Sequence, residues 1–393
     1  MRNITTNLHF LPDGMEELRL DAREFGDKII RPAAAAARAA KNTPPEVLDA
    51  MREKGYFGLS VPEEFGGLGF SYANVGGIIE ELSMADTGTT VVIPVHNSLF
   101  VDAILMFGTQ EQKENYLPRA ASGEIIGANC ITEPGAGTDV GSMAATAVDN
   151  GDYWLVNGDK QFITNATIAG AFIFFAKTDP EAGGRGISAF IIDADTPGLT
   201  IGKPESKISM PASVTAGVNL LDVQVPKENL LGELGKGFKI AMTVLNGGRI
   251  EMAFQSVGLA QEALNLALAH CRERKQFGKP ISAFQISQQK MARMAMLVNQ
   301  ARLAAYHAAG VKDKGHPYAR EAAMAKLFCS EVAHEVINDS LQLHGGNGLM
   351  GEYRISDLYL DQRVTEIYEG TSEAQILTIA GDLAKQFETD NPQ

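Results

Sequence analysis

Hydrophobic positions recur with helical spacing in the first third of the chain. Pro32 is expected to kink or break the first helix, and Thr43 and Thr109 stand where helix caps belong. The expected helices cover residues 15–40, 46–54 and 72–84, and another starts after Thr109. This part of the chain is therefore predicted to be helical.

The pattern changes after Gly123, where short β-branched and aromatic runs alternate with turns as far as about residue 231. Examples are residues 153–158, 171–176, 187–192 and 218–221. Asn157-Gly158 predicts a hairpin turn. A small all-β domain is expected here.

Helical spacing resumes near Gly237. We expect long helices at about 238–271, 281–312 and 317–344, and a shorter one at about 372–387. Gly345-Gly346 predicts a helix stop. The predicted fold is a multi-domain α+β protein. It has an N-terminal helical domain (1–124), a middle β-barrel or β-sandwich domain (125–233) and a C-terminal four-helix bundle (234–393).

Composition narrows the choice of partners. The chain has 34 basic and 48 acidic side chains and a net charge of −14, which argues against nucleic acid or an anionic membrane as partner. Cys130, Cys271 and Cys329 have no metal-ligand spacing, so we expect no metal site. Residues 1–10 carry no targeting signal and no apolar stretch reaches membrane-spanning length, which predicts a cytoplasmic protein.

Two stretches of the β region could bind a ligand. In residues 131–140, two glycines and a proline fix a turn flanked by Thr132 and Thr138, which would present polar groups to a flat ligand or a phosphate. Phe162 and Thr164 share one face of an expected strand and could stack on a ring and bond its edge. The alternatives are a structural turn, and a core phenylalanine beside a surface threonine.

Basic and glycine-rich stretches supply further candidates in the C-terminal third. Arg274, near the end of an expected helix, could bind a pyrophosphate, although the helix dipole alone favours a cation there. Residues 344–348 offer backbone amides for close approach, or simply a helix stop. Arg249 follows Gly247-Gly248; if these glycines start a helix, a cation there is mildly disfavoured, which favours a ligand role.

Residues 367–371 (Ile-Tyr-Glu-Gly-Thr) place a carboxylate between an aromatic ring and a Gly-Thr turn. Gly370 allows unusual dihedral angles, and Thr371 can cap the following helix. Glu369 is therefore expected on a stiff turn at a helix entry. A surface capping acid is the alternative.

Together these stretches resemble the acyl-CoA dehydrogenase family from about Glu16 to Phe387. The most specific matches are TEPGAGTD at 132–139, RKQFG at 274–278, QLHGGNG at 342–348 and IYEGTSE at 367–373. The resemblance implies an FAD-dependent enzyme in which Glu369 removes the α-proton of a CoA thioester and the β-hydride passes to flavin N5. It also implies that the backbone N–H of Glu369 and a flavin hydroxyl hold the thioester carbonyl.

By the same match, other residues take binding roles. Flavin contacts would come from Ile131, Thr132, Thr138, Phe162, Thr164, Thr371 and Glu373. The adenine-diphosphate half would be bound, partly across a subunit boundary, by Arg274, Phe277, Gln285, Gln342 and Gly346. Substrate contacts would come from Thr138, Arg249, Tyr368 and Gly370.

Several positions depart from the family pattern or refine it. Many members carry Trp where this chain has Phe162, and Arg-Ala/Gly-Ser where it has residues 210–213 (Met-Pro-Ala-Ser). Some members place the base at the position of Gly248, which here is expected to leave room beside Glu369. His96 lies where members that admit longer chains tend to carry smaller residues, so it would limit pocket depth; a loop histidine away from the pocket is the alternative.

Similarity to short-chain members at residues 95–99, 207–208 and 321–326 implies a dehydrogenase for short or short branched acyl-CoA. Its expected partners are an electron-transfer flavoprotein and three further copies, in a homotetramer built as a dimer of dimers. The first alternative is a same-fold enoyl-CoA reductase or acyl-CoA oxidase. A remote alternative is a non-catalytic helical protein that binds acyl-CoA.

Overall fold

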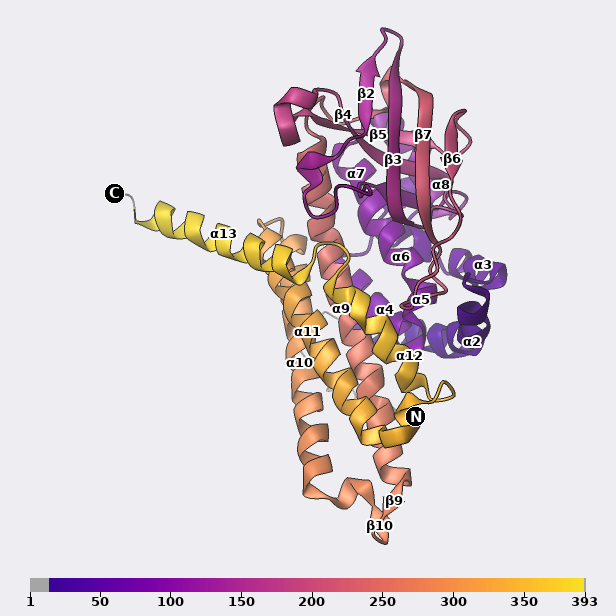
Figure 1. Cartoon of the computed structure of the whole chain (residues 1–393), viewed down its shortest axis with the longest axis vertical. Helices are drawn as coiled ribbons and strands as arrows, with labels where there is room; N and C mark the ends of the chain where they lie inside the picture. Colours follow the sequence, from indigo (N-terminus) through magenta and orange to yellow (C-terminus); the bar gives the residue numbers. More distant parts are fainter. Residues whose placement is uncertain (1–13, 392–393) are drawn as a thin grey trace.

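The computed structural model describes residues 14–391, and three successive segments of the chain form its three layers (Figure 1). Residues 1–10, which were considered for a targeting signal, lie outside the described residues. The order is helical, then β, then helical, as the sequence predicts.

The first segment is a helical layer beside the upper half of the long C-terminal helices (Figure 1). Its helices are α1 Met15–Phe25, α2 Arg31–Ala40, α3 Pro45–Glu53, α4 Tyr72–Ala85, α5 Thr87–Thr90, α6 Val92–Pro94, α7 Asp102–Phe107 and α8 Gln110–Ala121, with π-helical turns at Gly26–Ile30 and Val95–Val101. The expected break at Pro32 is a π-turn that passes into α2, so the chain stays helical. Thr109 caps α8 as predicted. Thr43 does not cap α3: Pro44 is its N-cap, and the Thr43 hydroxyl donates to the carbonyl of Ala212 instead.

The middle segment forms one eight-stranded mixed sheet, in the order β6-β7-β3-β2-β4-β5-β8, with β1 paired to β4. The strands are β1 Gly127–Cys130, β2 Thr146–Asp149, β3 Tyr153–Thr164, β4 Ala171–Lys177, β5 Ile187–Asp193, β6 Leu199–Ile201, β7 Thr215–Pro226 and β8 Leu230–Leu231. The strands β4 and β5 are buried on both faces, which matches their continuous apolar runs.

The predicted hairpin turn at Asn157-Gly158 is wrong, because both residues lie inside β3. The pairing of β3 with β7 shifts register between Val156 and Gly158, and the Asn157 side chain bonds the backbone and side chain of Asp222 across this bulge. The turn before β3 falls instead at Asn150-Gly151, where Gly151 has φ 82°. A residue pair that is typical of turns here stabilises a β-bulge.

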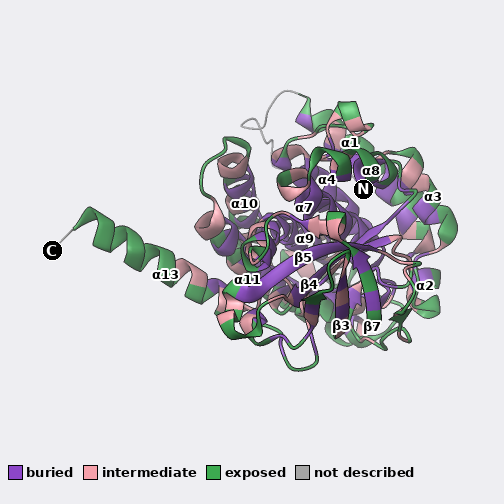
Figure 2. Ribbon diagram, turned by 90° about the horizontal axis from the view of Figure 1, so that it is seen from above, coloured by how far each residue is buried: buried purple, intermediate pink, exposed green. Residues whose placement is uncertain are grey.

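The third segment is built around α9 Gly237–Glu273, whose 37 residues run from the sheet to the opposite end of the molecule (Figure 1). The other elements are α10 Gln285–Asp313, α11 Ala319–His344, α12 Arg354–Asp361 and α13 Ser372–Asp390, with the short strands β9 Lys275–Gln276 and β10 Lys279–Pro280. The stop at Gly345 is confirmed. Residues 250–264 of α9 are all buried, as expected of a helix surrounded by others. The helix α13 does not close the expected four-helix bundle; beyond its first turns it extends away from the body (Figures 1 and 2).

One apolar stretch does reach membrane-spanning length, contrary to the expectation from the sequence. Residues 87–107 form 21 helical residues that are long and apolar enough to cross a membrane, so that expectation was wrong. However, 83% of the most apolar window is buried inside the protein, as is usual for a core helix.

Candidate active site

The turn that carries Glu369 lies between a 3₁₀ turn at Gln362–Glu366 and α13. Glu369 has φ 52° and Gly370 has φ 97°, so the chain is left-handed at two successive residues. For a glutamate this conformation costs on the order of 1–3 kcal/mol and persists only where neighbours impose it. Thr371 then caps α13 by accepting from the amide of Ala374, as predicted.

The carboxylate of Glu369 points at α9. A Cβ added at Gly248 would overlap Oε2 of Glu369 and press on Leu99, so the expected free room beside Gly248 does not exist while Glu369 is in place. Glu369 is half-buried as a residue, but both of its carboxylate oxygens are enclosed. Burial raises the pKa of Glu369 to about 7, against the opposing effect of the cations Lys326 and Arg249.

Three side chains from three helices hold the backbone of this turn. Lys326 Nζ on α11 and Gln375 Nε2 on α13 each donate to the carbonyl of Gly370 at 2.8 Å. Arg249 Nε on α9 approaches the carbonyl of Glu369 at 3.4 Å. Gly247 and Gly248 lie inside α9, so Arg249 is not at a helix start. Lys326 and Gln375 were missed by sequence reasoning, because no local pattern connects them with residue 369.

Unpaired oxygen atoms gather around the same turn. Among the described residues, the buried side-chain oxygens without a hydrogen-bond partner include both of Glu369, Oε2 of Glu251, Oε1 of Gln255 and Oε1 of Gln375. Gln255 Nε2 donates to the hydroxyl of Tyr368. Each unpaired buried polar atom costs about 1–3 kcal/mol. A polar ligand fits this place because it can meet these atoms.

A buried acidic pair, Asp102 on α7 and Glu251 on α9, lies near the base. Asp102 accepts from the hydroxyl of Tyr72 and from Lys312 Nζ beside Gly247. Burial raises the pKa of Glu251 well above its usual range, and Asp102 and Glu369 add to the effect.

The candidate flavin residues of the middle domain lie at the loop after β1 and at the end of β3. Lys160 Nζ, with its side chain fully buried, bonds Glu133 Oε1 at 2.8 Å and the carbonyl of Ile131 at 3.3 Å, while Glu133 accepts from the amide of Ala145. Thr132 accepts from the amide of Gln161, and Thr138 is exposed. A buried ion pair thus fixes the loop between β1 and β2 onto β3.

Phe162 and Thr164 end β3 next to that loop. Phe162 has φ 59° at a second register shift and is 58% exposed, whereas Ile163 between them is buried. An aromatic ring held out of the core on a strained backbone fits a stacking role and does not fit a core phenylalanine.

The candidate residues for the adenine-diphosphate half lie at the other end of the long helices (Figure 1). Arg274 ends α9, and Phe277 is 93% exposed in the β9–β10 turn. Gln285 begins α10, Gln342 and Gly346 lie at the end of α11 and just after it, and all three are exposed. Arg249 and Arg274 are 25 residues apart on α9, about 37 Å along the helix axis. One protomer does not bring the two groups together.

His96 does not have the contacts of a pocket residue. Its Nδ1 accepts from the amide of Gly127 at 2.8 Å, its Nε2 lies 3.2 Å from the carbonyl of Ala120, and its ring packs on Phe57 and Phe100. Burial lowers its pKa to about 4. It is a core histidine in a helix, and not the loop histidine of the alternative.

The loop that departs from the family pattern is tied down by α12. The amide of Met210 donates to Asp361 Oδ1 at 2.6 Å, and Arg38 pairs with the same carboxylate. Met210 is buried beside Gly88. Residues 210–213, which lack the arginine of the family pattern, are therefore held in place by a contact from Asp361.

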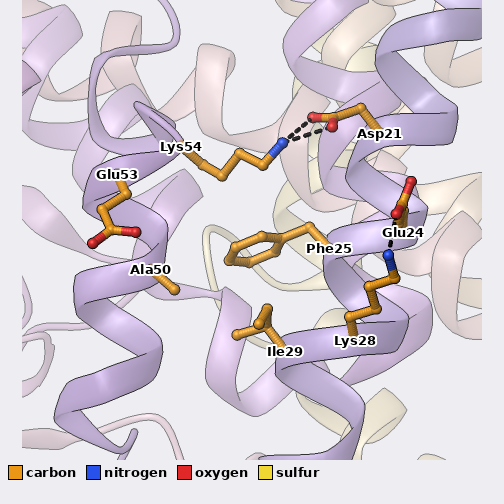
Figure 3. A pocket seen from close by; sticks show the side chains of 8 residues that line it. All are labelled: Asp21, Glu24, Phe25, Lys28, Ile29, Ala50, Glu53 and Lys54. Atoms are coloured by element: carbon orange, nitrogen blue, oxygen red, sulfur yellow. Dashed lines mark hydrogen bonds and ion pairs between the residues drawn. The ribbon is translucent and has the colours of Figure 1, made fainter.

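A surface hollow between α1 and α3 shares no residue with the Glu369 site (Figure 3). Phe25 and Ile29 lie in it, and its cations Lys54 and Lys28 already pair with Asp21 and Glu24. It offers little unpaired charge to a ligand.

Comparison with known proteins agrees with this geometry. The chain matches the acyl-CoA dehydrogenase N-terminal domain at residues 12–124, the middle domain at 128–223 and the C-terminal domain at 235–384. It is 43% identical to the mitochondrial short-chain specific acyl-CoA dehydrogenase of Bos taurus, over 96% of this chain and 92% of that protein. It is 41% identical to a caffeyl-CoA reductase–Etf complex subunit of Acetobacterium woodii, over 94% and 98%.

Among solved structures, butyryl-CoA dehydrogenase from Megasphaera elsdenii superposes with a TM-score of 0.93 at 39% identity, over 95% of this chain and 99% of that one. The loop after β1 and the exposed ring of Phe162 suit a flavin, and the unpaired acceptor oxygens around Glu369 suit a ligand that brings hydrogen-bond donors. The chain belongs to the acyl-CoA dehydrogenase family, and the protein is an FAD-dependent oxidoreductase.

Proposed function

We propose that the protein catalyses the α,β-dehydrogenation of a short or short branched-chain acyl-CoA, with Glu369 as the general base. The observation that carries this proposal is the enclosed carboxylate of Glu369, held on a left-handed turn against Gly248 with a pKa of about 7. A base whose pKa lies near working pH is present in its reactive form and still accepts a proton well.

The protein's own residues have distinct tasks in this reaction. Glu369 takes the α-proton, and its backbone N–H would bind the thioester carbonyl, where charge develops. Lys326, Gln375 and Arg249 hold the turn, and the walls formed by Gly248 and Leu99 exclude water. FAD, when bound, takes up the β-hydride, so the products are the trans-2-enoyl-CoA and reduced flavin.

FAD would be held by two separate groups of residues. Ile131, Thr132, Thr138, Phe162 and Thr164 lie at the flavin end, with Thr371 and Glu373 at the start of α13. Arg274, Phe277, Gln285, Gln342 and Gly346 would hold the diphosphate half of a cofactor bound mainly by another copy. Substrate contacts fall to Thr138, Arg249, Tyr368 and Gly370.

Two features support a homotetramer. Arg249 beside the base and Arg274 in the candidate diphosphate group are about 37 Å apart along α9 in one protomer. The helix α13 exposes Ile376, Leu377, Leu383 and Phe387, which are 48–71% exposed on a helix that extends away from the body (Figure 2). Such a row of apolar side chains is usually covered by a partner. An electron-transfer flavoprotein is proposed as the acceptor, supported by the name of the Acetobacterium relative.

The same residues could serve an enoyl-CoA reductase, since Glu369 at a pKa of about 7 can also return a proton. This second candidate rests on the name of the Acetobacterium relative, a caffeyl-CoA reductase–Etf complex subunit.

An anaerobic titration tests the proposal. The yellow protein should be bleached by butyryl-CoA, and its colour should return quickly with an electron-transfer flavoprotein but slowly in air. Rapid reoxidation in air would indicate an oxidase. A reductase would show the opposite behaviour. No saturated acyl-CoA would bleach it, whereas an enoyl-CoA would reoxidise enzyme whose flavin had been reduced chemically.

A further inference from the structure

Lys326 is a buried lysine beneath the turn that carries the base. It lies on α11, is 1% exposed, and its Nζ donates to the carbonyl of Gly370 at 2.8 Å. That carbonyl follows Glu369 directly in the chain. The contact therefore acts on the residue whose left-handed backbone aims the carboxylate.

A carbonyl group alone does not compensate a buried ammonium. Removing a charge from water costs several kcal/mol unless an opposite charge lies close by. The charged groups that face Lys326 are Glu369, Glu366 and Glu373, which favour its protonated form, and Arg249, which opposes it. Burial lowers the pKa of Lys326 to about 8, and Glu369 is the largest influence in the other direction.

We infer that Lys326 is a positioning residue for the catalytic base. Its ammonium fixes the carbonyl of Gly370 and supplies the positive charge that keeps Glu369 ionised in an enclosed site. With Arg249 as the only nearby cation, the buried charge of Glu369 would be less well compensated. The left-handed turn would also lose one of the contacts that hold it. Only the kinetic arm of the test below rests on the proposed function.

The first test uses thermal unfolding of the holoenzyme and needs no substrate. The Tm of Glu369→Gln minus that of the parent should grow with pH and level off about one pH unit above 7, where Glu369 is almost fully ionised. In a Lys326→Met background the same difference should keep growing for about one further pH unit, because a nearby cation has been lost. Lys290→Met, which removes a half-buried ammonium paired with Asp339 in the same bundle, is the matched control and should not move the levelling point.

An unmoved levelling point in Lys326→Met overturns the inference. If Lys326→Met does not fold, Lys326→Arg carries the test. Because the arginine keeps the charge, the levelling point must stay within a few tenths of a pH unit of the parent, and a shift as large as one unit overturns the inference.

The second test measures flavin reduction by butyryl-CoA across pH. Lys326→Met should move the acid limb upward by about one pH unit, and Lys326→Arg should restore most of it. A role in folding alone would lower the rate by the same factor at every pH, which would contradict the inference. If the parent is not reduced at all while the unfolding test succeeds, the proposed function fails and the inference stands.

Discussion

Glu369 carries two opposing demands at the scale of the residue. Burial of its carboxylate disfavours the ionised form, while Lys326 and Arg249 favour it, and the pKa of about 7 is the balance. A group whose pKa is raised on folding costs stability above that pKa. The ionised carboxylate therefore lowers the free energy of unfolding, and a neutral residue of the same shape would remove this loss.

Glu369→Gln should accordingly stabilise the protein at pH 8 but not at pH 4.5. The unfolded glutamate ionises near pH 4.5 and the folded one near pH 7, so the parent loses stability between these values, by about 3 kcal/mol at most. Chemical denaturation of both holoenzymes at the two pH values measures it. Equal stabilities at pH 8 would mean that the carboxylate is not desolvated.

The contact with Gly248 leads to a second prediction. Glu369→Gly should be nearly inactive, and Gly248→Glu should be harmful alone because the added side chain meets the Glu369 carboxylate. Combining the two removes the overlap and should recover part of the rate, with a loss of about a hundredfold from imperfect placement. Anaerobic flavin reduction measures all three variants. A folded, yellow double variant as slow as Glu369→Gly would show that the two positions do not reach the same proton.

Some of this site could be predicted from local sequence, and some could not. The turn at residues 367–371 combines an acid, a glycine and a cap within five residues, so its geometry is locally specified. Lys326 reaches the turn from 43 residues earlier and becomes visible only through helix packing. His96 was assigned a pocket role by position, yet its ring nitrogens face Gly127 and Ala120.

At the scale of elements, β3 and the loop between β1 and β2 form the candidate flavin platform. The strand is bulged twice, and the buried pair Lys160–Glu133 ties it to the loop. The sequence predicted the strand and the placement of Phe162 and Thr164 on one of its faces. It did not predict the bulges. Asn157-Gly158 has the composition of a turn, and it forms a bulge here because Asn157 bonds Asp222 on the neighbouring strand β7.

Lys160→Met should weaken FAD retention by tenfold or more, because it leaves Glu133 buried without its cation and frees the loop. Its stability cost should be about 3–5 kcal/mol. Flavin content after gel filtration and denaturant unfolding measure the two effects. Lys160→Met/Glu133→Gln should regain part of both, and a double variant no better than the single one would contradict the ion-pair explanation.

At the scale of the whole molecule, α9 spans the distance between Arg249 beside the base and Arg274 in the candidate diphosphate group. The order of helical, β and helical segments was predictable because hydrophobic spacing changes twice along the chain. The direction of α13 was not, because a helix with exposed Leu377 and Phe387 looks locally like any other amphipathic helix. The homotetramer proposed above would cover these side chains.

Arg274→Ala should therefore lower both flavin content and oligomer size. Loss of a diphosphate contact at a subunit boundary weakens the cofactor and the contact together. Gel filtration with multi-angle light scattering and flavin absorbance measure both, with Arg293→Ala, an exposed arginine on α10, as control. Unchanged size and colour would place Arg274 outside the cofactor site.

The central claim is that the Glu369 carboxylate takes the α-proton. The most direct measurement is the rate of anaerobic flavin reduction by butyryl-CoA in Glu369→Gln and in the parent. Glutamine keeps the shape and the fold, so the variant should stay yellow and folded while the rate falls by about 10²–10⁴-fold. A variant that is reduced within a few-fold of the parent rate would contradict the account.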